Sequence, residues 1–329
     1  MGFTDTFTFE FLILLIVSLV VSSIGFYKYV YFISLGYGFS VAAMGIALPI
    51  MYRDYLGWDT IIISLLFVIY GCRLGGYLLI REIKSASYRS TMKKEIKDGS
   101  SMKLVAKFSI WISCALLYAC QISPLYFRLQ NLTNLGGTEG DYVIETDAVA
   151  IVGAVIMILG ILLESMADLQ KSKAKKINPS RFCDKGLYKI VRCPNYLGEV
   201  LFWTGVYVSG INTYDGAWQW VAATFGYVCI VYIMFGGARR LELRQNRNYG
   251  DNPEFMKLER KEKLNGRCHK DSCRLSLQQY EQIVTGEAEE VFWETENKLL
   301  KQFCVHIMTK GFSPKLIVDY ERVAFVEEI

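Results

Sequence analysis

The sequence lacks both the paired cysteines of a secreted disulfide-rich domain and the glycine fingerprint of a Rossmann domain. Its nine cysteines show no extracellular pairing pattern, so we expect no disulfides. Cys268, His269 and Cys273 match no common zinc spacing and have no fourth ligand in view, so we interpret them as solvated and expect no metal site. No Gly-x-Gly-x-x-Gly follows a predicted strand, which excludes a Rossmann domain.

The first apolar run lacks the features of a removable signal. No cationic segment precedes Phe9 to Tyr27 and no convincing cleavage pattern follows it, so we interpret it as an anchor. The chain of 329 residues is 52% hydrophobic and 14% aromatic, which is high for a soluble protein. Its long apolar runs predict an all-α polytopic membrane protein with about seven transmembrane helices. The other six predicted spans are Tyr29 to Met51, Trp58 to Ile80, Leu104 to Phe127, Ala148 to Ala167, Leu197 to Ile211 and Ala217 to Gly237.

The charges between these spans sort by sign. Segments 81–103 and 170–192 are rich in Lys and Arg, whereas segment 129–147 is acidic. The positive-inside rule then predicts an N-terminus outside and a cytosolic C-terminus. The net charge of +4 is therefore concentrated on one membrane face, where it suits anionic lipid or an anionic cofactor, and it does not indicate a nucleic-acid partner.

A composition shift near residue 260 predicts two regions, a membrane domain at 1–259 and a cytosolic tail at 260–329. In the tail, the apolar residues Val291, Phe292, Leu299, Leu300 and Phe303 suit one amphipathic helix. The sequence indicates no role for this tail.

Ionisable groups inside spans are the strongest functional signal, because each costs roughly 2.5 to 3.5 kcal/mol on insertion scales. Four places qualify: Tyr70 with Arg73, Glu164 with Asp168, the group Arg192, Asn195, Tyr196 and Glu199, and the stretch after the last span with Arg239, Arg240, Arg244, Arg247 and Tyr249.

Some of these residues also have purely structural interpretations. Arg73 can snorkel or pair with a loop carboxylate, and Arg239 and Arg240 are what the positive-inside rule places after any last span. The glycines of "GCRLG" are typical of a close helix-packing seam. Glu199 favours function, because Asn195 four residues earlier places an amide on the same helix face.

Together these groups are expected at the cytoplasmic ends of the spans. A half-buried polar cavity there can hold an anionic, nucleotide-sized ligand, with Arg and Lys binding phosphates. The apolar remainder suits a lipophilic substrate.

Three segments carry a resemblance to a known family. The block "GLYKIVRCPNYLGE", the helix end "LGILLESMADLQKSKAK" and the segment "YGCRLGGYLLIREIKSASYR" occur in the order of corresponding motifs of the steroid 5-alpha-reductase superfamily. The resemblance covers about residues 60 to 255 and is closest to a little-characterised branch of it.

The resemblance implies an integral membrane reductase, in the endoplasmic reticulum or a bacterial inner membrane, that binds NADPH from the cytosol. Such an enzyme reduces a carbon–carbon double bond conjugated to a ketone in a lipophilic substrate. Asn195 and Glu199 would hold the nicotinamide carboxamide, and Tyr70 would match the active-site tyrosine, so the implied catalytic residues are Tyr70 and Glu199. By the same resemblance, Glu164 and Asp168 would lie near the adenosine or ribose portion and Tyr249 would close the cytoplasmic lid. Tyr196 would be a further cofactor contact. The implied phosphate contacts are Lys171, Lys175, Arg192, Arg239 and Arg240.

The implied chemistry is hydride addition to the β carbon of an enone, which builds negative charge on the carbonyl oxygen. Tyr70 could donate a hydrogen bond there, since a phenol stays protonated at neutral pH. The sequence departs from the family at two points: Tyr29 to Met51 has no acid to assist the tyrosine, and Cys193 stands where a histidine is usual.

Two other interpretations stay open. Isoprenylcysteine carboxyl and phospholipid methyltransferases share a similar Arg-His-Pro block and bind S-adenosylmethionine, but four arginines between 239 and 247 suit a polyphosphate cofactor better. A non-catalytic scaffold would leave Asn195 and Glu199 as packing groups.

Overall fold

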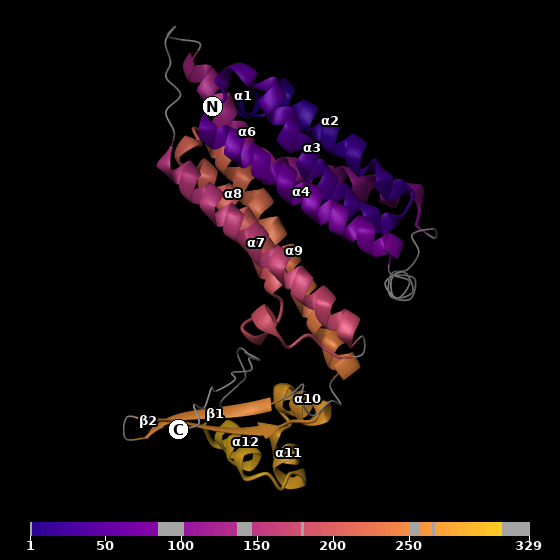
Figure 1. The fold of residues 1–329 in the computed structure, drawn as a ribbon, viewed down its shortest axis with the longest axis vertical. Coiled ribbons are helices and arrows are strands. Elements are labelled where there is room, and N and C mark those ends of the chain that lie inside the picture. The colour runs from indigo at the N-terminus through magenta and orange to yellow at the C-terminus, as the bar shows by residue number, and fades with distance from the viewer. Residues whose placement is uncertain are drawn as a thin grey trace. The chain divides into compact units, whose positions relative to one another are not determined.

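The computed structural model describes residues 2–84, 102–136, 147–178, 181–249, 257–264 and 267–310 (Figure 1). The chain divides into two compact units, residues 1–164 with 196–235 and residues 165–195 with 236–329. Each unit has a hydrophobic core of its own.

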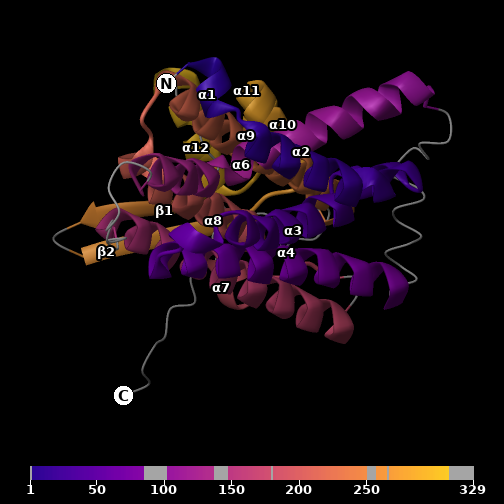
Figure 2. The same cartoon turned by 90° about the horizontal axis from the view of Figure 1, so that it is seen from above.

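The first unit is built of helices. In order along the chain up to Tyr249, the helices are α1 (Phe3–Thr6), α2 (Phe9–Ser22), η1 (Ser23–Phe26), η2 (Tyr29–Phe32), α3 (Leu35–Met51), η3 (Arg53–Tyr55), α4 (Trp58–Lys84), α6 (Leu104–Gly136), α7 (Ala148–Ile177), η5 (Gly186–Lys189), α8 (Pro194–Gly210), η6 (Ile211–Thr213) and α9 (Ala217–Tyr249). Of these, η5 belongs to the second unit, and α7, α8 and α9 have residues in both units. Figures 1 and 2 show α2, α3 and α4 side by side.

The prediction of an all-α polytopic membrane fold is confirmed. Within the described residues, six segments are long and apolar enough to cross a bilayer: Phe9–Phe26, Tyr29–Met51, Trp58–Lys84, Leu104–Asn134, Ala148–Ile177 and Ala217–Asn248. The remaining predicted span corresponds to α8, a helix of 17 residues that is not among these six. The predicted orientation of the termini stays a prediction.

Close contact of α3 with α4 depends on glycines, as the sequence predicts for "GCRLG". A β carbon added at Gly38 would lie 2.8 Å from the backbone nitrogen of Gly75, and one added at Gly71 would lie 2.6 Å from that of Ala42. No side chain fits at such separations, so the small residues let the two backbones meet.

A second glycine seam joins α7 to α8. A β carbon at Gly160 would lie 2.5 Å from the nitrogen of Phe202, and one at Gly198 would lie 2.7 Å from that of Glu164. Further along the pair, a β carbon at Gly153 would lie 2.6 Å from the carbonyl oxygen of Gly205. This seam fixes the side of α8 that faces α7.

The second half of helix α6 is continuously buried in the first unit, with every residue from Tyr118 to Gln130 buried. It continues through Pro124, which has no N–H to bond the carbonyl of Cys120. The Ser123 hydroxyl donates to that carbonyl oxygen instead, at 2.8 Å.

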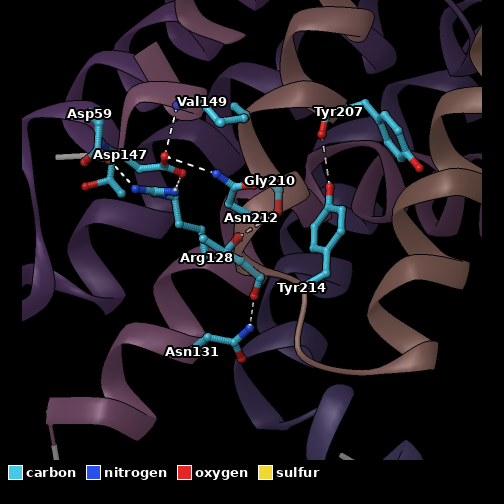
Figure 3. Close-up of polar contacts among 12 residues, drawn as sticks. Asp59, Arg128, Asn131, Asp147, Val149, Tyr207, Gly210, Asn212 and Tyr214 are labelled. Carbon is cyan, nitrogen blue, oxygen red and sulfur yellow. Dashed lines mark hydrogen bonds and ion pairs between the residues drawn. The ribbon is translucent and has the colours of Figure 1, made fainter. Parts of the chain in front are cut away.

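The start of α4, the last part of α6 and the start of α7 are joined by buried charge (Figure 3). The Arg128 guanidinium forms ion pairs with Asp59 and, at 3.0 Å, with Asp147. Burial by itself raises the pKa of Asp147, but hydrogen bonds from the Val149 backbone and from Arg128 outweigh it and lower that pKa.

The second unit contains structure that the sequence does not predict. Strands β1 (Lys257–Leu264) and β2 (Arg267–Arg274) pair antiparallel, with Lys257 opposite Arg274 and Leu264 opposite Arg267. Three helices follow, α10 (Leu277–Thr285), α11 (Ala288–Glu294) and α12 (Lys298–Lys310).

The amphipathic pattern in the tail is confirmed, but its interpretation as one helix was wrong. Val291 on α11 and Leu300 on α12 are both buried in one core, and Asn297 starts a new helix by accepting hydrogen bonds from the backbone of Leu299 and Leu300. The expectation that Cys273 is solvated was also wrong: it is buried in the same core, because β2 packs against α12.

Candidate functional site

A buried hydrogen-bonded cluster lies inside the first unit, and we call it the tyrosine network. It consists of Tyr37 from α3, Tyr70 from α4, and Glu199 and Trp203 from α8. All four are buried. The Tyr37 hydroxyl donates to Glu199 Oε1 at 3.0 Å and accepts from Trp203 Nε1 at 2.6 Å. The Tyr37 and Tyr70 hydroxyl oxygens are 3.1 Å apart, and either can donate.

Counting hydrogens fixes the direction of the network. A phenol has one hydrogen to donate and two lone pairs to accept with. Because Tyr37 donates its hydrogen to Glu199, the remaining contact requires Tyr70 to donate to Tyr37. Tyr70 therefore carries a hydrogen that can turn to another acceptor, while Glu199 and Trp203 hold Tyr37 in place.

Ring packing also holds Tyr70 in place. Its ring stacks on Phe202 with centroids 3.9 Å apart and planes 8° apart, and Trp203 meets it edge-on at 5.8 Å. The position of Phe202 is set by the α7–α8 seam, because Gly160 lets the Phe202 backbone come close to α7. The ring environment is apolar, and such surroundings strengthen a hydrogen bond to developing charge.

Arg73 and Glu164 form an ion pair between α4 and α7, also within the first unit. Arg73 lies about one helical turn after Tyr70, and Glu164 is 4% exposed. Arg73 therefore does not snorkel but forms an ion pair. Its partner, Glu164, lies on helix α7 and not in a loop. Glu164 was predicted near the adenosine or ribose portion of the cofactor, and the structure places its carboxylate on this arginine.

In the second unit, α9 holds Arg192 by three side chains. The Arg192 guanidinium donates to Glu242 at 3.2 Å, to Gln245 at 3.4 Å and to Asn246 at 3.2 Å. Arg192 was predicted as a phosphate contact, and this arrangement fixes its position against α9.

The turn before Arg192, in the "GLYK" block, is held by contacts within the protein. Gly186 has φ +62°, a value that favours glycine. The side chain of Gln170 on α7 accepts from the Leu187 backbone at 2.8 Å and fills the space where a β carbon would be, 2.5 Å from its oxygen. Gln170 thus anchors the loop.

Cations gather near this loop. Burial raises the pKa of the Cys193 thiol, while Lys171 and Arg192 act to lower it. Burial likewise raises the pKa of Cys183, where Lys171 and Lys175 act in the opposite direction. Both lysines, predicted as phosphate contacts, therefore lie within electrostatic reach of the same loop as Arg192.

Asn195 has a buried amide oxygen with no hydrogen-bond partner among the described residues. Since an unpartnered buried polar atom is costly, this oxygen is placed to accept a hydrogen bond from a bound molecule or a water. Asp168 is also buried. These two residues belong to the same unit as the cations.

The remaining predicted residues have more peripheral positions. Arg239 and Arg240 are both exposed, but helix geometry separates them: Arg239 lies on the face of Asn246, seven residues on, while Arg240 is turned about 100° away from Arg239 around α9. Tyr196 is half-buried. Tyr249 ends α9, and its side chain lies outside the described part of the structure.

Sequence reasoning found Tyr70 and Glu199 but missed Tyr37 and Trp203. The available signal for Tyr37 was a polar tip between two glycines in a span without acids, since a buried tyrosine hydroxyl usually finds a partner. It also missed Gln245 and Asn246, which no pattern singles out among the polar residues of that segment.

The described residues fit an anionic cofactor at the second unit: cations lie on one loop and one helix, and Asn195 offers an acceptor for an amide N–H. Within the described ranges, no group of three or more His, Cys, Asp or Glu residues could hold a metal.

The fold and these clusters define a polytopic helical membrane protein with a buried polar centre. Residues 11–262 match the family described as "Protein of unknown function (DUF1295)", and the chain belongs to this family. Residues 237–329 match the "VTC domain". No curated protein and no solved structure matches the chain.

Proposed function

We propose that this protein is a membrane-embedded, NADPH-dependent reductase of a carbon–carbon double bond conjugated to a ketone in a lipophilic substrate. One observation carries the proposal: Tyr70 holds a hydrogen that can turn to a ligand, in an apolar interior, with Tyr37, Glu199 and Trp203 fixing its neighbour. The resemblance of three segments to the steroid 5-alpha-reductase superfamily supports it.

The tyrosine network suits charge that develops on a carbonyl oxygen. When bound, the cofactor supplies hydride to the β carbon. Tyr70 then turns its O–H from Tyr37 to the ketone oxygen and stabilises the negative charge there, an effect worth most where water is excluded. A proton taken up from water at the α carbon would complete the reduction, so that one hydride and one proton add across the double bond.

Glu199 provides the acid that α3 does not. The sequence places no carboxylate in Tyr29 to Met51, yet Glu199 from α8 reaches Tyr37 of that helix. An acid beside the tyrosine pair is thus present by a different route, which supports a ketone-binding role for the network.

Cofactor binding is proposed for the residues around α8 and α9. Asn195 and Glu199, four residues apart in α8, would hold the carboxamide. Lys171, Lys175 and Arg239 would bind phosphates, because Arg and Lys are the usual phosphate ligands. Arg192, held by α9, would position that surface, and the proposed site faces the cytosol.

The test is a binding titration of the detergent-purified protein with NADPH, NADH and S-adenosylmethionine. The proposal predicts that NADPH binds much more tightly than either of the others, and that Glu199→Gln weakens it. Binding of S-adenosylmethionine alone would contradict the proposal and favour a membrane methyltransferase. The matched control is Glu290→Gln, whose exposed carboxylate accepts from the Gln282 side chain at 3.1 Å and belongs neither to the tyrosine network nor to the proposed cofactor contacts.

A further inference from the structure

Gln121 on α6 is a buried amide that nothing in the site above uses. Gln121 is only 2% exposed. Neither the oxygen nor the nitrogen of its amide has a hydrogen-bond partner among the described residues. An amide buried without partners in a membrane interior is strongly unfavourable. A side chain of this kind indicates a ligand group that bonds to it when present.

Helix geometry gives the direction in which Gln121 points. It lies seven residues before Arg128, so the two share a face to within about 20°. Arg128 meets Asp59 of α4 and Asp147 at the start of α7. Helix α9 lies against α6 at the Cys120–Gln121 peptide, because a β carbon at Gly226 would lie 2.7 Å from the Gln121 backbone nitrogen. Gln121 therefore lies on the face of α6 that it shares with Arg128, with α9 beside it.

The same geometry places Gln121 close to the tyrosine network. Tyr118, whose ring centroid is 5.2 Å from that of Tyr37, is three residues earlier, about 4.5 Å along the axis. Arg128 pairs with Asp59, so positions along the antiparallel helices α4 and α6 can be compared from that pair. Tyr70 is eleven residues from Asp59, about 16.5 Å, and Gln121 is seven residues from Arg128, about 10.5 Å. Gln121 is therefore roughly 6 Å nearer than Tyr70 to the Asp59 end of α4. A single ligand could reach both.

We propose that Gln121 binds a second oxygen of the lipophilic ligand, a hydroxyl or carbonyl on the part remote from its ketone. This inference rests on the proposed function, since it takes the ketone to lie at Tyr70. The amide can donate to a carbonyl and accept from a hydroxyl, so both oxygen types satisfy it. A ligand without this oxygen leaves the amide buried and unpartnered, which makes Gln121 a specificity determinant.

The experiment compares wild type with Gln121→Leu, using testosterone and its 17-deoxy analogue as probes. Thermal unfolding of the ligand-free protein is measured first. We expect Gln121→Leu to raise the melting temperature, because it removes an unpartnered amide. We then expect wild type to bind testosterone about tenfold more tightly than the analogue, as one hydrogen bond allows, and Gln121→Leu to bind both alike.

Ser64→Ala is the matched control. The Ser64 hydroxyl is also buried without a partner among the described residues, but its residue contacts the Gly45 side of α3. We expect this variant to keep the preference for testosterone.

A lower melting temperature for ligand-free Gln121→Leu would overturn the inference, since the amide would then already be bonded. Equal binding of the two steroids by wild type would also overturn it while leaving the proposed function intact. Failure of both steroids to bind a wild-type protein that binds NADPH would overturn the inference alone, whereas failure of that protein to bind NADPH would remove the proposed function and the inference together.

Discussion

Changing Tyr37 or Tyr70 to phenylalanine is expected to affect different quantities. Tyr37→Phe should mainly lower the free energy of unfolding, and Tyr70→Phe should mainly lower kcat. Tyr37→Phe removes the donor to Glu199 and the acceptor of Trp203 Nε1. A hydrogen bond to a charged group contributes about 1.5–3 kcal/mol, and a buried donor left without an acceptor costs about 1–3 kcal/mol. The loss is therefore about 2.5–6 kcal/mol of the free energy of unfolding.

Tyr70→Phe removes only one donation between neutral phenols, at 3.1 Å, which contributes about 0.5–1.5 kcal/mol. Its kcat for enone reduction should nevertheless fall about 10²- to 10³-fold, as when an oxyanion donor is removed. Tyr37→Phe should be the less stable variant and Tyr70→Phe the less active one.

Thermal unfolding in detergent and NADPH oxidation with an enone measure the two quantities. Tyr118→Phe is the control, because its hydroxyl donates to the Phe32 backbone carbonyl at 2.7 Å and lies outside the tyrosine network. A Tyr70→Phe protein that is less stable than Tyr37→Phe, or fully active, would refute the reasoning.

Three further expectations concern packing, charge and cofactor contacts. Gly71→Ala should lower the melting temperature by several degrees because its β carbon would meet α3, whereas Gly76→Ala, with nothing within 4 Å, should be neutral or slightly stabilising in the same unfolding assay. The lowered pKa of Asp147 stabilises the fold above its unfolded pKa of about 3.9 and is lost as pH falls through the lower folded value, so Asp147→Asn should flatten the fall in stability below about pH 4. Arg239→Ala should weaken NADPH binding by on the order of tenfold and Arg240→Ala should not, as a titration of both variants would measure.

The membrane fold was predictable because span length and hydrophobicity are local properties of the sequence. The α3–α4 seam was predictable for a similar reason, since glycines in an apolar helix have few other uses. The tail was not. The β1–β2 pairing joins strands of mixed charge, and the break between α11 and α12 depends on the capping of one helix by Asn297, which an amphipathic pattern does not reveal.

The candidate site was predictable in part. Glu199 and Tyr70 are noticeable in sequence because polar groups in spans are costly. Their connection through Tyr37 depends on which faces α3, α4 and α8 present to one another, and those faces are set by two glycine seams far apart in sequence. The pairing of Arg73 with Glu164 is non-local in the same way.

The most direct test of the central claim is transfer of deuterium from deuterated NADPH to an enone. Purified protein, deuterated NADPH and testosterone are incubated together, and the product is analysed by mass spectrometry. The account predicts a saturated ketone with one deuterium at the β carbon, and loss of this product with Tyr70→Phe. A product without deuterium, from a wild-type protein that binds both compounds, would contradict it. Undiminished deuterium transfer by Tyr70→Phe would contradict it as well.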